Sequence, residues 1–276
     1  MNENSIKISV CLVVYNEEKV IGRCLESIKN LADEIILVHD GECLDKTLEI
    51  AKQYTDKIFI RPHTGDSSLH RVFTYKQAQG EWIFQIDADE YLDEDAAGKI
   101  KELVDKAKGT NVNGYRFKWE MWNGKKAIYI KGFQKDCLFR KDYFHYLGVT
   151  HGWAYIDGIT EDSDLCLHHR PKYNNIAWGS FFKKVKRWVP THAKFYFPEM
   201  VVYEGFNIDS EKWIQFVGRV KDHMWFYMIF EPIKMFFGQF KNGLYSRFVG
   251  WKVAFQHSLY YFILYLEVWK LKKKLK

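Results

Sequence analysis

The segment Asp87-Ala88-Asp89-Glu90 places three carboxyl groups directly after a short apolar run, WIFQI. In an extended chain the side chains at positions i and i+2 point the same way, so Asp87 and Asp89 would face one ligand. Buried carboxylates without partners are costly, and a hard divalent cation held with phosphate oxygens would satisfy both. The alternative is a solvated turn, whose acids are favoured by the positive end of the helix that follows.

Other polar residues stand at comparable points of the sequence. Asn16 and Glu17 lie at the end of the apolar run ISVCLVVY, and Asp40 follows EIILVH. Such near-continuous apolar runs are typical of strands that are buried on both faces of a parallel sheet. Because ligands of these sheets bind beyond the carboxyl ends of the strands, we expect these side chains to line one ligand-binding edge together with Asp87 and Asp89.

Strand and helix signals alternate through the first hundred residues. The pattern predicts strands over residues 8–15, 34–39, 57–60 and 82–86, a helix that Asn16 caps, a helix that ends near Tyr54, and helices over residues 69–79 and 95–107. Short connections between such elements imply a parallel sheet covered by helices. Beyond residue 111 the pattern indicates short strands over residues 114–119, 128–130 and 137–140 between polar turns, and from about residue 175 it becomes helical.

The prediction is therefore an α/β fold. It has a Rossmann-like, mostly parallel sheet with helices on both faces, followed by a C-terminal helical extension. We expect the catalytic domain over residues 1–175 and the basic, aromatic extension over residues 176–276.

Charge and cysteine content restrict the setting of the protein. Of the net charge of +6, residues 221–276 contribute ten Lys or Arg against three Asp or Glu, so the earlier part is close to neutral. Five cysteines without a C-x-x-C pair argue for a reducing compartment and against a zinc site. No secretory signal is visible, and the uncharged stretch Val253–Leu266 is shorter than the ~20 residues that span a membrane. We expect a cytoplasmic protein.

Two stripes of large apolar residues repeat at helical spacing near the end of the chain. Packing against the catalytic domain would explain part of both. The other interpretation is peripheral attachment to an anionic membrane surface, with Trp and Tyr at the interface and the terminal lysines against lipid. The stripes comprise Trp225, Met228, Ile229, Ile233, Phe236, Phe237 and Phe240, and then Trp251, Phe255, Leu259, Phe262, Ile263, Leu266 and Trp269.

The motifs VVYNEE, HDGECLDKT and DADEYL follow one another at regular intervals. In this arrangement the chain resembles the family 2 glycosyltransferases, which are inverting enzymes of the GT-A fold, and it looks closest to their lipopolysaccharide-core subgroup. The resemblance implies that Asn16 and Glu17 border the nucleotide, that Asp40 hydrogen-bonds the base and that Asp87 meets the ribose side. Asp89 would ligate Mg²⁺ or Mn²⁺, which would neutralise the leaving nucleoside diphosphate.

An inverting enzyme also needs a general base for the acceptor hydroxyl, and three candidates stay open. Asp162 is preferred, because Glu161-Asp162 resembles the family's Glu-Asp pair, whose Asp is the usual base. Glu161 is the second candidate and His151 the third. In another alignment GVTHGWAYIDG resembles the subgroup's Val-His-Glu motif, but Gly152 stands where a Glu is expected. A polar surface loop is the alternative interpretation of this segment.

Further candidates lie near these motifs. Arg71 precedes the fourth strand, where the subgroup carries basic residues near the donor, and it could offset diphosphate charge. The other interpretation is a solvated helix face. His168 and His169 follow an apolar strand-like segment, and one of them could approach the metal or the diphosphate.

These observations favour an inverting, metal-dependent glycosyltransferase, with a hexose as the expected sugar. It would use a nucleotide sugar as donor and a cell-envelope glycan or glycolipid, such as the lipopolysaccharide core, as acceptor. A sugar nucleotidyltransferase would need a Gly-rich basic loop where this chain has Asn16-Glu17-Glu18. A non-catalytic glycan- or nucleic-acid-binding protein would suit the basic end, but an acidic edge repels phosphate, so we expect no nucleic acid partner.

Overall fold

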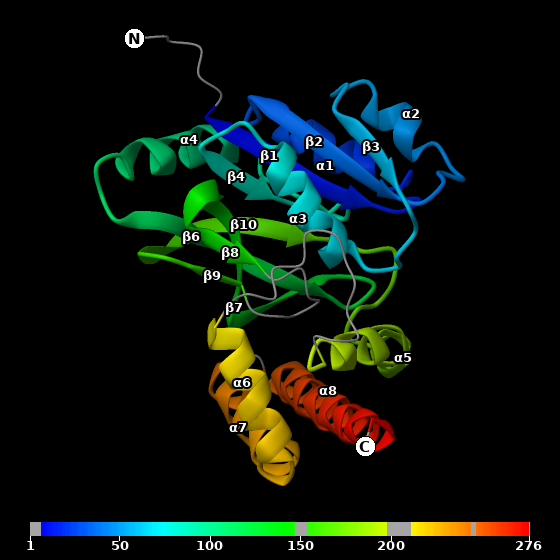
Figure 1. Ribbon diagram of the computed structural model, residues 1–276. Helices are drawn as coiled ribbons and strands as arrows, with labels where there is room; N and C mark the ends of the chain where they lie inside the picture. The colour runs from blue at the N-terminus through cyan, green and yellow to red at the C-terminus, as the bar shows by residue number, and fades with distance from the viewer. Residues whose placement is uncertain (1–6, 147–153, 198–210, 244–246, 276) are drawn as a thin grey trace. The chain divides into compact units, whose positions relative to one another are not determined.

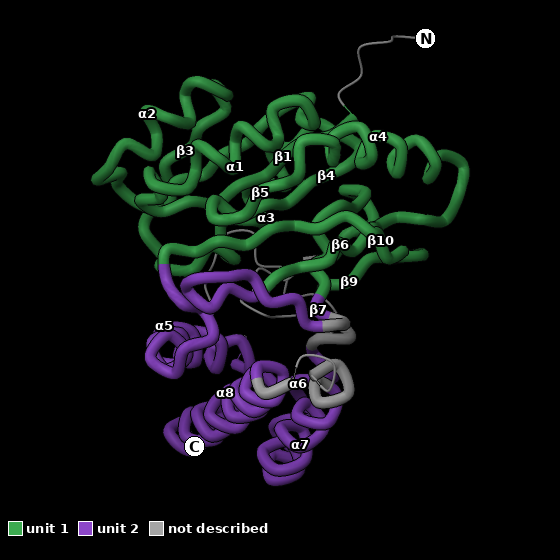
Figure 2. The backbone as a smooth tube through the Cα atoms, turned by 180° about the vertical axis from the view of Figure 1, so that it is seen from behind, with its two compact units in different colours: residues 1–120, 134–148, 154–172 green, residues 121–133, 149–153, 173–276 purple. Residues whose placement is uncertain are grey.

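The computed structural model describes residues 7–146, 154–197, 211–243 and 247–275 (Figure 1). The chain divides into two compact units, which we call unit 1 and unit 2 (Figure 2). Unit 1 consists of residues 1–120, 134–148 and 154–172, and unit 2 of residues 121–133, 149–153 and 173–276. The predicted domains, 1–175 and 176–276, stay a prediction, because compactness does not establish which part folds by itself.

Most of an eight-stranded sheet lies in unit 1, in the order β3-β2-β1-β4-β7-β6-β10-β5. Its parallel half is formed by β1 (Ile8–Val14), β2 (Glu34–Asp40), β3 (Ile58–Arg61) and β4 (Trp82–Gln85). The other half is formed by β7 (Ala127–Arg140), β6 (Val112–Trp122), β10 (Ile159–His169) and β5 (Glu90–Tyr91). Strand β7 runs antiparallel to β4, β10 runs parallel to β6, and β5 runs antiparallel to β10. A separate two-stranded sheet pairs β8 (Phe144–Tyr146), which follows the short 3₁₀ helix Lys141–Tyr143, with β9 (Ala154–Ile156).

Side chains of the central strands alternate between two cores, one on each face of the sheet. In β1, Val10 and Leu12 belong to the larger core, whereas Cys11 belongs to the smaller one. This alternation follows from the two-residue period of a strand. Helices α1 (Ile21–Ile28), α2 (Thr47–Ala51) and α4 (Ala96–Lys106) contribute to the larger core, and α3 (Ser67–Gln77) covers the other face. The predicted fold class, a mostly parallel sheet with helices on both faces, is confirmed.

Unit 2 contains the predicted helical extension. Its described helices are α5 (Trp178–Lys194), α6 (Glu211–Asp222), α7 (Met224–Gly243) and α8 (Arg247–Lys274). Helix α8 packs along α7 and against α5. Within the part of the chain that the structure describes, no helix is both long and apolar enough to cross a membrane.

Candidate functional site

The motif after β4 forms a turn and not an extended segment. The Glu90 amide donates to the Asp87 carbonyl oxygen at 2.9 Å, which closes the turn. The expectation that Asp87 and Asp89 lie on an extended segment and point the same way is therefore wrong, and a ligand shared by the two stays a prediction. A turn breaks the two-residue period of a strand, and the two carboxylates meet different partners.

Asp87 lies in a cluster of paired charges. Its Oδ1 accepts from Arg71 Nη2 at 2.7 Å, and its Oδ2 accepts from Lys135 Nζ at 2.9 Å. Lys135 also donates to Glu90 at 2.6 Å. The position of Lys135 follows from the antiparallel register, which pairs Phe84 with Leu138 and, continued by three residues, brings Lys135 opposite Asp87. Two acids and two bases therefore neutralise one another within this cluster.

Burial and charge act against each other in this cluster. Burial alone would raise the pKa of the Asp87 carboxyl, but the charges of Arg71 and Lys135 hold that pKa well below its ordinary value. Burial also dominates at Glu90 and raises the pKa of its carboxyl, although Lys135 opposes the shift. At Lys135, burial would lower the pKa of the ammonium group, and Asp87 and Glu90 raise it. Asp87 is therefore held as a carboxylate by fixed cations.

Asp89 faces a histidine. Its Oδ2 lies 3.3 Å from Nε2 of His169, and the antiparallel pairing of His169 with Glu90 accounts for this proximity. The His169 ring stacks on the Trp119 indole at a centroid distance of 4.4 Å. Trp119 in turn donates its Nε1 hydrogen to Glu90 at 2.7 Å. The orientation of His169 is thus set by neighbours that are themselves anchored.

Asn16 and Glu17 lie beside this pair. Asn16 adopts a left-handed backbone, with φ of 52°, and its side-chain oxygen accepts from the Leu44 amide at 2.8 Å. It does not cap α1 as predicted, because the helix begins only at Ile21. Burial raises the pKa of the Glu17 carboxyl, Lys172 at 3.0 Å opposes this shift, and the charge of nearby Asp89 adds to it. Glu17 and Asp89 are therefore brought together, as expected.

The pair Asp89–His169 suits a divalent cation. A carboxylate oxygen and an imidazole nitrogen form a donor set that Mn²⁺ accepts, whereas Mg²⁺ would rely more on oxygen ligands. Among the described residues, Asp89 has no Lys or Arg within ion-pair distance, unlike Asp87 and Glu17. Its carboxylate therefore faces an imidazole nitrogen and no fixed cation among the described residues, so the residues present fit a metal ion.

Asp40 organises a loop. Its carboxylate accepts from the Thr64 amide at 2.6 Å and the Gly65 amide at 2.9 Å, and His70 Nε2 lies 2.9 Å away. Burial would raise the pKa of the Asp40 carboxyl, but the hydrogen bonds from His70 and Thr64 lower it. Because both oxygens are already used inside the protein, the contact of Asp40 with a nucleobase stays a prediction.

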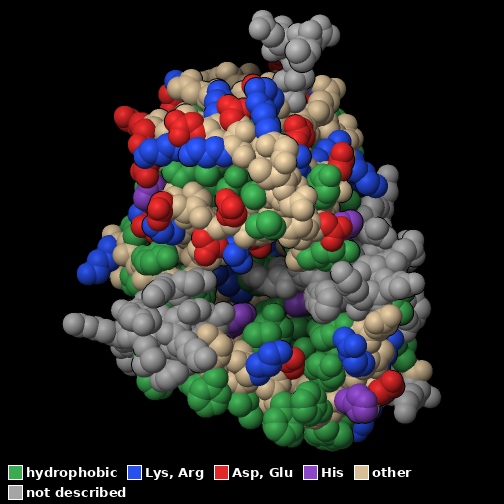
Figure 3. Space-filling model, turned by 90° about the vertical axis from the view of Figure 1, so that its left-hand side faces the viewer, with side chains coloured by type: hydrophobic (Ala, Val, Ile, Leu, Met, Phe, Trp, Pro, Cys, Tyr) green, Lys and Arg blue, Asp and Glu red, His purple; other side chains and the backbone are tan. Residues whose placement is uncertain are grey.

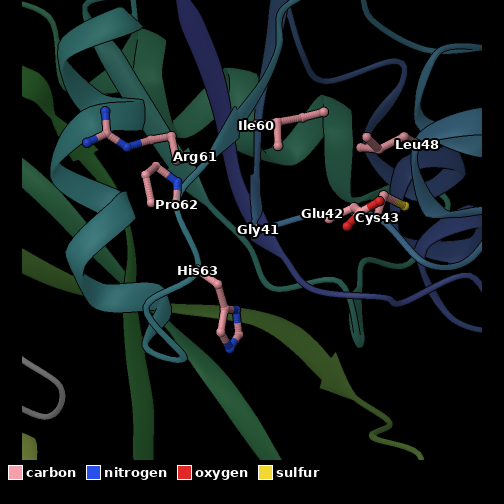
Figure 4. Close-up of a pocket in the computed structure, with 8 residues that line it drawn as sticks. All are labelled: Gly41, Glu42, Cys43, Leu48, Ile60, Arg61, Pro62 and His63. Carbon is pink, nitrogen blue, oxygen red and sulfur yellow. The ribbon is translucent and has the colours of Figure 1, made fainter.

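A pocket of about 670 Å³ lies beside Asp40, between the ends of β2 and β3 and helix α2 (Figure 4). In this view Ile60 and Leu48 extend toward one another across it, while Arg61 turns away, and its guanidinium lies 4.2 Å from the centroid of the Phe73 ring. Gly41 has φ of +95°, and a Cβ at this position would lie 2.8 Å from His63. Only glycine therefore fits where the chain enters this pocket.

The general-base candidates lie elsewhere. Asp162 pairs with Arg116 at 2.7 Å on a largely exposed surface, and neighbouring Glu161 is also exposed. Asp162 stands seven residues before His169 on the same strand, β10, which corresponds to roughly 20 Å. The structure does not bring Asp162 or Glu161 together with Asp89. His151 lies outside the described residues.

Two functional candidates escaped the sequence analysis. Lys135 is the buried cation that holds Asp87 and Glu90, and its signal was a lysine two residues before the apolar Cys137 on one strand. Glu120 was the other. His168 Nδ1 lies 3.0 Å from Glu120, and His168 Nε2 lies 2.9 Å from Asp93. Cys166 belongs to the same cluster, but Arg170 already pairs with Glu120 at 2.7 Å. This second group is therefore an ion-pair network.

A family model described as Glycosyl transferase family 2 matches residues 9–163. An uncharacterised glycosyltransferase of Rickettsia typhi is 31% identical over 133 residues, which make up 48% of this chain and 42% of that protein. The lipopolysaccharide core biosynthesis glycosyltransferase LpsC of Rhizobium meliloti is 30% identical over 116 residues, which make up 40% of this chain and 41% of that protein. The matched segments thus span less than half the length of these relatives.

Solved structures with a similar backbone also exist. S. aureus TarS 1–349 in complex with UDP-GlcNAc is 14% identical, with a TM-score of 0.44 over 98% of this chain and 92% of that chain. Glucosyl-3-phosphoglycerate synthase from Mycobacterium tuberculosis, in complex with Mn²⁺ and UDP-glucose, is 21% identical, with a TM-score of 0.35 over 41% of this chain and 44% of that chain.

Proposed function

Since the chain belongs to glycosyl transferase family 2, we propose that it transfers a sugar from a nucleotide sugar to a hydroxyl group of a cell-envelope glycan, with inversion at the anomeric carbon. The lipopolysaccharide core is the acceptor that we favour. Its support is the resemblance over the N-terminal motifs and the similarity to the lipopolysaccharide core glycosyltransferase of Rhizobium meliloti.

One observation carries this proposal. Asp89 faces His169 at 3.3 Å and has no Lys or Arg partner among the described residues, whereas Asp87 and Glu90 beside it are neutralised by Arg71 and Lys135. A divalent ion at this pair would supply the positive charge that stabilises the leaving diphosphate. Asp89 and His169 would hold the ion, and Trp119 would keep the His169 ring in place.

The nucleotide has a suitable place near the same strand ends. The Tyr15 and His63 rings lie 4.7 Å apart, close to the end of β1 and to the loop that Asp40 holds. Flat rings of this kind can stack on a nucleobase. We propose that Asp40 acts in donor binding by fixing the loop of residues 63–65, and that Asn16 and Glu17 border the nucleotide.

In the transfer step one bond forms, one bond breaks and one proton is transferred. The acceptor oxygen forms a bond to the anomeric carbon as the bond from that carbon to the diphosphate oxygen breaks. The hydroxyl proton passes to a general base. The family resemblance suggests Asp162 for this role, whereas its exposed pair with Arg116 argues against it. We propose that the reaction takes place in the cytoplasm, because five cysteines without a C-x-x-C pair favour a reducing compartment.

A donor screen tests the proposal. The full chain would be incubated with UDP-, GDP-, ADP- and CMP-sugars, with Mn²⁺, with Mg²⁺ and with excess chelator, and thermal unfolding and nucleotide release would be followed. We expect one nucleotide class to raise the unfolding temperature and to be hydrolysed slowly, only when metal is present. Stabilisation that persists in chelator would contradict the metal-dependent mechanism. Consumption of a nucleoside triphosphate and a sugar phosphate, with release of pyrophosphate, would instead identify a nucleotidyltransferase.

A further inference from the structure

Helix α7 in unit 2 exposes a row of large apolar side chains. Six of them are each between 47% and 63% exposed. At 100° per residue, they fall within roughly 140° of the helix circumference. They are Trp225, Phe226, Ile229, Phe230, Ile233 and Phe237.

The side of α7 opposite the exposed row packs against the neighbouring helix α8. Met224 and Met228 are buried there, and α7 lies along α8. Ser258 of α8 also donates a hydrogen bond to the Pro232 carbonyl at 2.8 Å. The internal packing that would account for an apolar stripe is thus supplied by a different set of residues, and the exposed row needs another explanation.

The exposed row continues onto α8. The rings of Trp225 and Trp269 have centroids 6.0 Å apart, and those of Phe236 and Trp251 lie 6.3 Å apart. Phe255 and Phe262 of α8 are exposed as well. We call the exposed apolar residues of α7 and α8 together the aromatic face. Figure 3 shows hydrophobic side chains gathered over the helices of unit 2.

The aromatic face is large for a solvent-exposed surface. The four aromatic rings of α7 alone leave roughly 400 Å² accessible, if each ring presents about half of its area. The largest apolar patch on a soluble monomer is typically about 300–600 Å² and is often functional, and exposed Ile229, Ile233, Phe255 and Phe262 extend this one further. The patch therefore indicates a surface that is covered in the working protein.

Basic residues stand at one end of this face. Lys273 lies over the Trp269 ring, with Nζ 3.9 Å from its centroid, and Lys270, Lys272 and Lys274 belong to the same last turns of α8. The region from residue 221 to residue 276 carries a balance of +7. Aromatic rings beside lysines suit a boundary between apolar chains and anionic head groups.

We propose that the aromatic face lies flat on an anionic membrane surface, with the α7 side chains in the interfacial layer and the α8 lysines against lipid phosphates. Helices that lie flat on the surface need no membrane-spanning segment. A second copy of the chain fits less well, because self-association would bring two basic helix ends together, whereas anionic lipids neutralise them. The proposal is independent of sugar transfer, since it concerns unit 2 and needs no donor.

Vesicle flotation of the full chain without nucleotide tests this inference. We expect binding to phosphatidylcholine vesicles that contain phosphatidylglycerol and much weaker binding to phosphatidylcholine alone. Raising the ionic strength from about 0.1 M to about 1 M should weaken binding, because the Debye length falls from about 10 Å to about 3 Å. Phe226→Gln with Phe230→Gln should lower the bound fraction by about tenfold, because it removes two rings from the interface.

Matched variants distinguish vesicle binding by the aromatic face from nonspecific binding through other exposed apolar residues. Tyr143→Gln with Ile159→Gln removes two similarly exposed apolar residues from unit 1 and should leave vesicle binding unchanged. Lys270→Gln with Lys274→Gln should reduce binding to anionic vesicles. If the phenylalanine variant does not fold, this lysine variant tests the proposal in its place. Three results would overturn the proposal. They are failure to float with either vesicle, equal binding by the parent and by both α7 and α8 variants, and a dimer in sedimentation that the phenylalanine variant dissociates.

Discussion

Asp87 and Asp89 are two residues apart, yet the protein surrounds them differently. Asp87 lies among Arg71, Lys135 and Gln85, all of which donate to its carboxylate. Asp89 faces only a histidine among its described ion-pair partners. The first carboxylate is neutralised by the fold, and the second keeps a charge that a bound cation could neutralise. Two aspartates of one motif can therefore have different roles, one structural and one suited to ligand binding, because different strands supply their neighbours.

The largest effect is expected on stability, when the cation that contacts both Asp87 and Glu90 is removed. Lys135→Met would leave Asp87 with Arg71 and would remove the only Lys or Arg that contacts Glu90 within the described residues. A buried charge that loses its partner destabilises by roughly 3–5 kcal/mol, which urea unfolding would register. Lys118→Met is the matched control, because its pair with Asp164 is exposed and should contribute far less. Equal unfolding midpoints for the two variants would contradict the charge balance described for Asp87.

Asp40 is a second buried carboxylate, and its contribution to stability should depend on pH. Asp40→Asn would weaken the hydrogen bonds that hold residues 63–65, at a cost of about 1–3 kcal/mol at neutral pH. The pKa of Asp40 is lower in the folded than in the unfolded protein. Its contribution is therefore full above its ordinary value near pH 4, and it is lost as pH falls toward the folded value. Urea midpoints of parent and variant should differ at pH 7 and converge under acid. A difference that grows as the pH is lowered would refute this role.

The smallest effect is expected at an exposed carboxylate. If Asp162 is the base, Asp162→Asn should lower turnover by ~10²–10⁴. Its pairing with Arg116 and its separation of roughly 20 Å from His169 along β10 lead us to expect a change of no more than a few-fold. Steady-state kinetics with a soluble acceptor analogue would decide, with Asp164→Asn on the same strand as control. A loss of a hundredfold or more with unchanged donor binding would restore Asp162 as the base.

Much of the fold could be predicted because its signals are local. The apolar runs before Asn16 and Asp40 have the composition of buried strands, and β1 and β2 form within a residue of the expected bounds. The edge of the sheet that gathers Glu17 and Asp89 follows from the rule for parallel strands. The two short strands expected near residues 128–130 and 137–140 form one strand, β7, because the polar residues between them are tolerated inside a long antiparallel pairing.

The site was harder to predict than the fold, because its contacts join residues that lie far apart in the sequence. Lys135 reaches Asp87 through the register of β7 on β4, and His169 reaches Asp89 through β10 on β5. No local pattern determines either register. The turn at Asp87–Glu90 was also missed, since the preceding strand suggested an extended continuation. Motif resemblance located the acids, and only the strand pairing shows which of them is already neutralised.

Metal titration of parent and Asp89→Asn protein tests the central claim most directly. Calorimetry would measure Mn²⁺ binding in the presence of the nucleotide found in the donor screen, with Asp95→Asn as control, because Asp95 is an exposed acid that pairs with Lys99. We expect parent and Asp95→Asn to bind one Mn²⁺ alike, and Asp89→Asn to lose binding, because the amide has the size of the carboxylate without its charge. Unchanged Mn²⁺ affinity in Asp89→Asn would contradict the assignment of this carboxylate to the metal.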